Sequence, residues 1–180
     1  MLLEEGYERT SVERITARVG IARGTFYLYF EDKEALFRAL AESLYAPMVE
    51  VLEQTAAALE EVPDMGSQQM IYLQMSARLA TVIQQNREGV TLHFRERRSA
   101  GPAGRIVAEW MARIEALACQ MLGDASDRGM IRGVDPYTVA LAIVGAAERL
   151  LWGWVSGDEG LDADHAALQL ANVFFGGISA

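Results

Sequence analysis

The side chains best suited to bind an anionic partner gather near the N-terminus. Between Arg9 and Phe30 the sequence carries four arginines and one glutamate, a net charge of +3, whereas the whole chain of 180 residues has a net charge of −9. Arginines donate to phosphate oxygens and to base edges, and nearby hydroxyl groups can do the same. This distribution favours a local anion-binding segment on an acidic protein, although a solvated helix face with scattered arginines has the same charge.

Residues that could perform catalysis are few and widely separated. His93 and His165 lie far apart in the sequence, Cys119 lies in an apolar segment, and neither a Gly-rich phosphate loop nor metal-ligand spacing occurs. The sequence therefore argues against an enzyme and predicts no catalytic residue, no metal and no cofactor. A single cysteine is also typical of a protein from a reducing compartment.

The composition indicates a folded protein with a subunit interface. Hydrophobic residues make up 51% of the chain, which is more than a monomer of this size needs to bury. The longest uncharged apolar stretch, from Pro136 to Ala147, is shorter than the roughly 20 residues of a membrane span. The N-terminus, Met1 to Glu5, lacks a secretory signal pattern. We therefore expect a cytoplasmic protein with no transmembrane helix and no membrane partner.

Apolar residues recur at helical spacing along nearly the whole chain, and no stretch alternates with the period of a strand. The sequence predicts an all-α fold of about nine helices. A capping box from Thr10 to Glu13, with Thr10 as the N-cap, predicts a short helix over 11–19 that ends at a left-handed Gly20. A second short helix is expected over 23–29 and a long one after Asp32 as cap. Further helices are expected over 66–85, 86–97, 103–125, 136–156 and 164–176.

Two short helices that meet at Gly20 have the dimensions of a helix-turn-helix, whose second helix enters the major groove of DNA. The surrounding sequence contains Gly6-Tyr7, Thr10-Ser11, Ile15, Val19-Gly20-Ile21, Gly24-Thr25-Phe26-Tyr27-Leu28-Tyr29-Phe30 and Lys33-Glu34-Ala35-Leu36. These residues resemble the N-terminal signature of TetR-like transcriptional regulators. Within this segment Ala22 stands where the family usually has a capping serine, Thr16 replaces a usual alanine, and the family's first helix starts further upstream of Gly6.

The resemblance implies a ligand-responsive repressor that binds a palindromic DNA operator as a homodimer and is released by a small effector. It implies a three-helix DNA-binding domain, residues 1–46, and an effector-binding and dimerisation domain, residues 47–180. Arg23 is expected to contact bases, and the expected DNA contacts together are Thr10, Ser11, Arg23, Gly24, Thr25, Tyr27, Tyr29 and Lys33. The core of the three helices is expected to contain Ile15, Val19, Phe26, Phe30 and Leu36.

The segment from Tyr137 to Ser156 carries only two charges. A helix that is apolar nearly all round is buried on both sides, so one stripe is expected to face the chain itself and another to meet a partner subunit. The resemblance implies that this segment and the last helix form the dimer interface. The residues expected there are Val139, Ile143, Ala146, Leu150, Trp154, Leu168, Ala171, Phe174 and Phe175. The alternative is a core formed within one chain.

In the family an apolar cavity among the middle helices binds the effector. Aromatic and methionine side chains there suit an apolar or amphipathic ligand with one polar group, while ordinary core packing is the alternative for each residue. Arg95, Arg97 and Arg98 suit the C-terminal end of their helix, and the phosphates of an acyl thioester are a second interpretation. The candidate lining residues are Tyr72, Met75, Leu79, His93, Phe94, Trp110, Ile114, Val144, Glu148 and Trp152.

Two other functions fit the same sequence. An all-α carrier of small molecules or lipids could have lost DNA binding, and a structural DNA-binding protein could lack an effector. Salt-dependent DNA binding would exclude the carrier. A pocket that a ligand can fill would exclude the structural protein.

Overall fold

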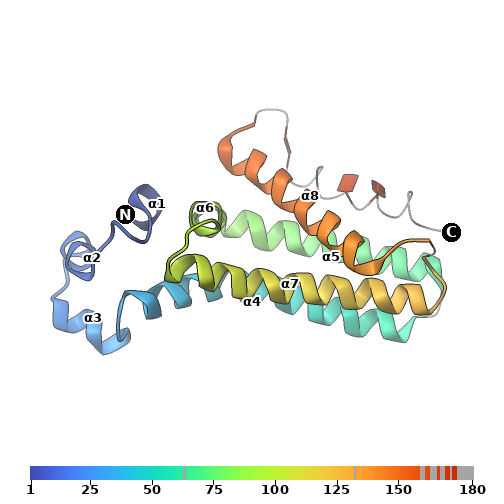
Figure 1. The fold of residues 1–180 in the computed structure, drawn as a ribbon, viewed down its shortest axis with the longest axis horizontal. Helices are drawn as coiled ribbons and strands as arrows, with labels where there is room; N and C mark the ends of the chain where they lie inside the picture. Colours follow the sequence, from blue (N-terminus) through green and yellow to red (C-terminus); the bar gives the residue numbers. More distant parts are fainter. Residues whose placement is uncertain are drawn as a thin grey trace. The chain divides into compact units, whose positions relative to one another are not determined.

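The computed structural model describes residues 1–62, 64–131, 133–158, 161–162, 166, 169–170 and 172–173. The regular elements of this part of the chain are α-helices, which confirms the predicted all-α fold (Figure 1). The predicted helix over 164–176 lies mostly outside the described residues. The helices are α1 (Leu2–Glu5), α2 (Val12–Val19), α3 (Arg23–Tyr29), α4 (Lys33–Glu61), α5 (Met65–Gln85), α6 (Arg87–Glu96), α7 (Pro102–Asp127) and α8 (Pro136–Ser156).

Local sequence signals explain where several helices begin and end. The Ala35 N–H donates to the Asp32 carboxylate at 2.8 Å at the start of α4, as the sequence predicts. At the start of α8 the Asp135 carboxylate accepts from the Thr138 N–H at 2.8 Å. That helix ends at Gly157, which has the left-handed φ of +82° that glycine adopts without strain.

The chain divides into two compact units, and the long helices α4 and α7 contribute to both. The first unit comprises Met1–Tyr45 and Asn86–Trp110, so it contains α1, α2, α3, α6 and the beginnings of α4 and α7. The second unit comprises Ala46–Gln85 and Met111–Ala180. The assignment of DNA binding to residues 1–46, and of effector binding and dimerisation to residues 47–180, remains a prediction.

The core of the first unit is built around aromatic and branched side chains of α3, α4 and α7. Phe37, Ile106 and Val107 are almost completely buried, and Phe26 packs against Phe30 with ring centroids 5.5 Å apart. The expectation that Val19 packs in this core is wrong, because its side chain is 64% exposed. It is the last residue of α2, where the chain turns at Gly20 and leaves the end of the apolar face uncovered.

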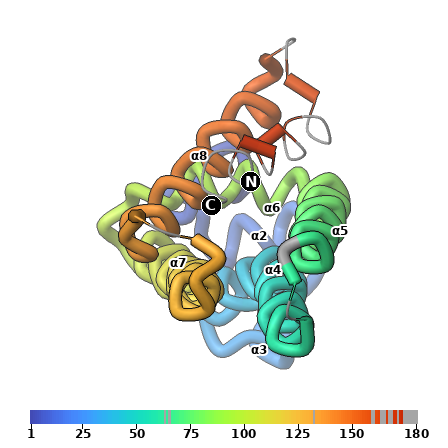
Figure 2. Tube along the Cα trace, turned by 90° about the vertical axis from the view of Figure 1, so that its right-hand side faces the viewer, coloured from blue at the N-terminus to red at the C-terminus, as the bar shows by residue number. Residues whose placement is uncertain are grey.

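The second unit packs the later parts of α4 and α7 beside α5 and α8 (Figure 2). Side chains from α4, α5 and α7 line one pocket together, so these three segments are neighbours. The beginning of α8 packs on the end of α7, where Ala118, Leu122 and Ala140 are buried. The apolar spacing of these helices therefore produces a helical bundle, in agreement with the predicted all-α fold.

Candidate nucleic-acid interface

The turn between α2 and α3 is fixed by backbone and capping hydrogen bonds. Ser11 is the N-cap of α2, and its Oγ accepts from the Arg14 N–H at 3.3 Å. At the other end Gly20 has a left-handed φ of +79°, and the Ile21 N–H donates to the Thr16 carbonyl at 3.0 Å. α3 then begins at Arg23, as predicted, so α2 and α3 form a helix-turn-helix.

Thr10 has a different role from the one that the capping box predicts. Its hydroxyl donates to the Gly6 carbonyl at 2.8 Å, and the residue is only 2% exposed. The prediction that Thr10 caps α2 is wrong, because Ser11 has the extended backbone of an N-cap (φ −115°, ψ 159°). In this conformation the Thr10 hydroxyl is buried away from any phosphate.

The outer face of α3 exposes large side chains. Leu28 is 81% exposed and Tyr29 is 77% exposed, and Tyr27 also faces solvent, whereas Phe26 is buried. Near the start of the helix, no heavy atom lies within 4 Å of the point that a Cβ on Gly24 would occupy. Exposed apolar side chains beside an open backbone are typical of a surface that meets a macromolecular partner.

Arg23 is held at the first turn of α3 by two neighbours. Its guanidinium forms an ion pair with Glu13 at 2.7 Å and donates to the Tyr27 hydroxyl at 3.3 Å. Hydrogen bonds to the backbone N–H of Glu13 and to Ser11, together with the charge of Arg23, lower the pKa of the Glu13 carboxyl. Arg23 is exposed, so its guanidinium is accessible to another anionic acceptor.

Lys33 lies at the beginning of α4 and has partners inside the protein. Its ammonium donates to the Tyr7 carbonyl at 2.8 Å and to the Thr10 carbonyl at 2.9 Å. The same nitrogen lies 4.0 Å from the centroid of the Tyr7 ring. The resemblance assigns Lys33 to phosphate binding, but the structure places its charge on the connection between α1 and α2.

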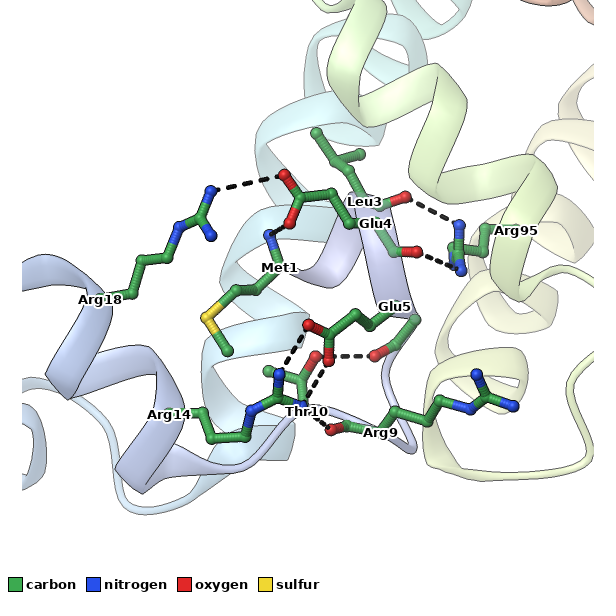
Figure 3. A network of polar contacts seen from close by, with 10 residues as sticks. Met1, Leu3, Glu4, Glu5, Arg9, Thr10, Arg14, Arg18 and Arg95 are labelled. Carbon is green, nitrogen blue, oxygen red and sulfur yellow. Dashed lines mark hydrogen bonds and ion pairs between the residues drawn. The ribbon is translucent and has the colours of Figure 1, made fainter.

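A polar network ties α1 to α2 and α6 (Figure 3). Arg95, from α6, donates to the carbonyls of Leu3 and Glu4, both at 2.8 Å, at the C-terminal end of α1. Arg14 forms an ion pair with Glu5, and its hydrogen bond lowers the pKa of the Glu5 carboxyl. Arg95 therefore caps a helix other than its own, which the sequence pattern does not reveal.

Glu96 is a second residue of α6 that the sequence does not single out. It is buried, and its carboxylate accepts from the Tyr7 N–H at 2.8 Å. The one sequence feature that could have indicated a buried role for Glu96 is its position among three arginines, Arg95, Arg97 and Arg98. The same pattern is equally compatible with an exposed helix end. Arg97 and Arg98 are exposed.

Residues 1–40 match the family model described as bacterial regulatory proteins of the TetR family. This match covers the helix-turn-helix and the residues that carry the resemblance. The chain resembles TetR-family transcriptional regulators. Among its relatives is the fatty acid metabolism regulator protein of Bacillus subtilis, which is 25% identical over 167 residues, 90% of this chain and 81% of the relative. The transcriptional repressor AcnR of Corynebacterium diphtheriae is 45% identical over 51 residues, 28% of this chain and 27% of the repressor.

Solved structures have the same fold as this chain. SmeT, the repressor of a multidrug efflux pump of Stenotrophomonas maltophilia, aligns with a TM-score of 0.77 at 19% identity and covers 99% of this chain and 85% of SmeT. FadR from Bacillus subtilis, solved in complex with stearoyl-CoA, aligns with a TM-score of 0.75 at 20% identity and covers 98% of this chain and 93% of FadR.

Three of the predicted effector residues of the regulator lie in the first unit. His93, Phe94 and Trp110 join Tyr45 in an aromatic cluster, in which the Tyr45 hydroxyl lies 2.5 Å from His93 Nδ1. Tyr45 also stacks on Trp110 with centroids 5.6 Å apart. Tyr45 and His93 are both buried. The sequence does not single out Tyr45, which supplies the polar partner that a buried imidazole needs.

The other predicted effector residues lie in the second unit. Met75, Leu79 and Val144 are half-buried, Ile114 and Glu148 are buried, and Trp152 is 49% exposed. Tyr72 lines the pocket between α4, α5 and α7, where burial raises the pKa of its hydroxyl to about 12. The sequence does not single out the rest of that pocket, which is lined by Ala56, Leu59, Glu60, Gln68, Met121, Asp124, Ala125 and Arg128.

α8 presents two different faces. Val139 and Ile143, predicted for the dimer interface, pack against the buried cluster at the end of α7, while Ala146, Leu150 and Trp154 are half-buried. Tyr137, Leu141 and Trp152 are exposed. Four further residues predicted for this interface lie outside the described residues: Leu168, Ala171, Phe174 and Phe175.

α8 is apolar enough by length and composition to cross a membrane, with a mean hydropathy of 1.4 over 18 residues, of which 22% are buried. The uncharged stretch from which no transmembrane helix was expected ends at Ala147. The longer window includes Glu148 and Arg149. Glu148 is buried within the second unit.

Proposed function

We propose that this TetR-like regulator is a repressor that binds a palindromic DNA operator as a homodimer and leaves it when a small apolar or amphipathic effector binds. The observation that carries the proposal is the exposed face of α3, with Arg23 at its first turn and Tyr27, Leu28 and Tyr29 uncovered. A helix of this kind enters the major groove, where arginine recognises base edges.

Four of the proposed DNA contacts, Arg23, Gly24, Tyr27 and Tyr29, are exposed, and Ser11 and Thr25 are half-buried. Arg23 contacts bases, Gly24 and Thr25 allow a close approach of the helix to the groove, and Tyr27 and Tyr29 flank the backbone. Ser11 lies at the N-terminus of α2, where free amides also attract phosphate. We leave Thr10 out of this set because its hydroxyl is buried.

The homodimer would form through the exposed face of α8. Tyr137, Leu141 and Trp152 lie on one side of this helix, and only part of its apolar surface is buried within the chain. A second copy would cover that side by two-fold symmetry, and the same symmetry suits half-sites about 34 Å apart. Leu141→Glu should therefore convert the dimer to a monomer in sedimentation equilibrium, while Met70→Glu, an exposed control on α5, should not.

The effector class is supported by the ligands that similar proteins bind. FadR has been solved with stearoyl-CoA, and SmeT with triclosan. Stearoyl-CoA is amphipathic, with a long acyl chain and a phosphorylated polar part, and triclosan is largely apolar with one hydroxyl group. The Tyr45 and His93 cluster and the pocket at Tyr72 combine aromatic surface with polar atoms in this chain. If either probe at saturation left the operator affinity unchanged, it would not be an effector.

DNA binding is tested by fluorescence anisotropy with DNA that flanks the regulator's own gene, at several salt concentrations. Tight binding that weakens steeply with salt is expected, and Tyr29→Ala should lower the affinity about ten-fold. Met70→Ala is the matched control on an exposed residue outside the helix-turn-helix. A folded protein with no salt-sensitive binding to any duplex would instead be the all-α carrier.

A further inference from the structure

The connection between α1 and α2 is held from both sides at Tyr7. The Tyr7 N–H donates to the Glu96 carboxylate of α6 at 2.8 Å, and the Tyr7 carbonyl accepts from the Lys33 ammonium of α4 at 2.8 Å. The Tyr7 ring packs edge-on against Phe37 with centroids 5.4 Å apart, and the residue is buried. The backbone and ring of Tyr7 are therefore held by the Glu96 carboxylate, the Lys33 ammonium and the Phe37 ring.

The ammonium of Lys33 makes three contacts inside the protein. It has three N–H donors, of which two bind the carbonyls of Tyr7 and Thr10, while the face of the Tyr7 ring lies at 4.0 Å. Lys33 is partly buried. A phosphate oxygen would have to compete with these internal contacts for the ammonium.

The same contacts determine where the helix-turn-helix begins. Thr10 is followed directly by Ser11, the N-cap of α2, and the Thr10 hydroxyl donates back to Gly6. Lys33 therefore holds the backbone next to the start of α2, and Glu96 holds the segment before it. Because α2 continues into α3 through the tight turn at Gly20, the position of this connection sets the position of α3.

We propose that Lys33 and Glu96 are positioning residues for DNA binding: they clamp the Tyr7–Thr10 connection and so orient α2 and α3, and Lys33 does not bind a phosphate. This inference rests on the proposed DNA-binding function for its effect on affinity. The clamp itself is a property of the free protein, so it can be tested separately.

The first test uses the fact that Lys33 is the only lysine in the chain. Acetylation with an amine-reactive ester labels Lys33 and the N-terminal amine, and peptide mass spectrometry separates the two. In the free, folded protein the clamp should slow the labelling of Lys33 by at least about ten-fold relative to the urea-unfolded chain. Bound DNA should add little further protection. Rapid labelling of the free protein, with protection only by DNA, would overturn the proposal.

The second test compares Lys33→Met with Lys33→Arg in operator binding. A lost phosphate contact reduces the magnitude of the salt slope, d log K/d log [salt], by about one, whereas a lost positioning contact lowers the affinity and leaves the slope unchanged. Arginine is an excellent phosphate ligand but cannot reproduce a compact ammonium between two carbonyls and a ring. We expect both variants to lose about ten-fold in affinity with an unchanged slope. A Lys33→Arg variant that binds like the native protein, with a smaller slope for Lys33→Met, would contradict the clamp.

The two hypotheses fail in different ways. If the native protein binds no DNA, the proposed function is wrong, and the labelling experiment still decides whether the clamp exists. If the variants do not fold, labelling of the native chain serves the same purpose. Arg98→Met, which removes an exposed cation from the same unit, is the control and should leave the labelling of Lys33 unchanged.

Discussion

Arg23 and Glu13 form an ion pair of 2.7 Å that links the first turn of α3 to the first turn of α2. Both side chains are more than half exposed, so the pair is open to competition from DNA. The carboxylate therefore restrains Arg23 in the free protein and also places a negative charge on the surface that we propose to face phosphates.

Glu13→Gln should strengthen DNA binding. The substitution removes repulsion between a carboxylate and the DNA backbone and releases Arg23, so we expect an increase of about three- to ten-fold in affinity at low salt. Anisotropy titrations of the variant and the native protein measure this change. Glu109→Gln, which also removes an exposed carboxylate paired with an arginine of the first unit, is the control. An unchanged or lower affinity for Glu13→Gln would place Glu13 outside the interface.

Glu96→Ala should destabilise the protein by about 1 to 3 kcal/mol, because the buried Tyr7 N–H then has no acceptor from this side chain. Glu96→Gln keeps an oxygen at the same distance along the side chain and should cost less. Urea unfolding, followed by circular dichroism, gives both free energies. Equal losses in the two variants would mean that the charge of Glu96, rather than its hydrogen bond, stabilises the connection.

Gly20→Ala should destabilise the helix-turn-helix by about 1 kcal/mol through backbone strain alone. Gly20 has a φ of +79°, and no heavy atom lies within 4 Å of the point that its Cβ would occupy. Thermal unfolding of the variant tests this cost. Gly24→Ala is the matched control, because that site is also open but lies in the α-helix, where alanine is favoured and should stabilise slightly.

Tyr72 should make the stability of the regulator sensitive to high pH. Its pKa is raised from 10.0 to about 12 by burial, so the folded state favours the neutral hydroxyl. This contribution is complete below pH 10 and is lost as the pH rises from 10 through 12, with a total of at most about 3 kcal/mol. Tyr72→Phe removes the titration. The unfolding free energy of the native protein should therefore fall relative to that of the variant over this range, and parallel curves would show that the hydroxyl does not titrate there.

The sequence by itself determined the helices and the helix-turn-helix. α3 and α8 have the predicted bounds, and α2, α4, α5, α6 and α7 lie close to theirs, because capping groups, glycines and apolar spacing act over only a few residues. The short helix α1 was not predicted. The same local rules also produced the error at Thr10. Two adjacent residues, Thr10 and Ser11, can both cap a helix, and only the buried bond from Thr10 to Gly6 assigns the cap to Ser11.

Only the tertiary structure decided the partners of the charged residues. Glu96 and Tyr7 are 89 positions apart, and Lys33 lies 26 positions from Tyr7, so no local pattern records that they meet. A long flexible side chain has the same sequence signature whether it faces solvent, a phosphate or a buried carbonyl. Packing of α4 and α6 around the α1–α2 connection brings the Lys33 ammonium to the carbonyls of Tyr7 and Thr10. Only this tertiary contact supports the interpretation of Lys33 as an internal clamp.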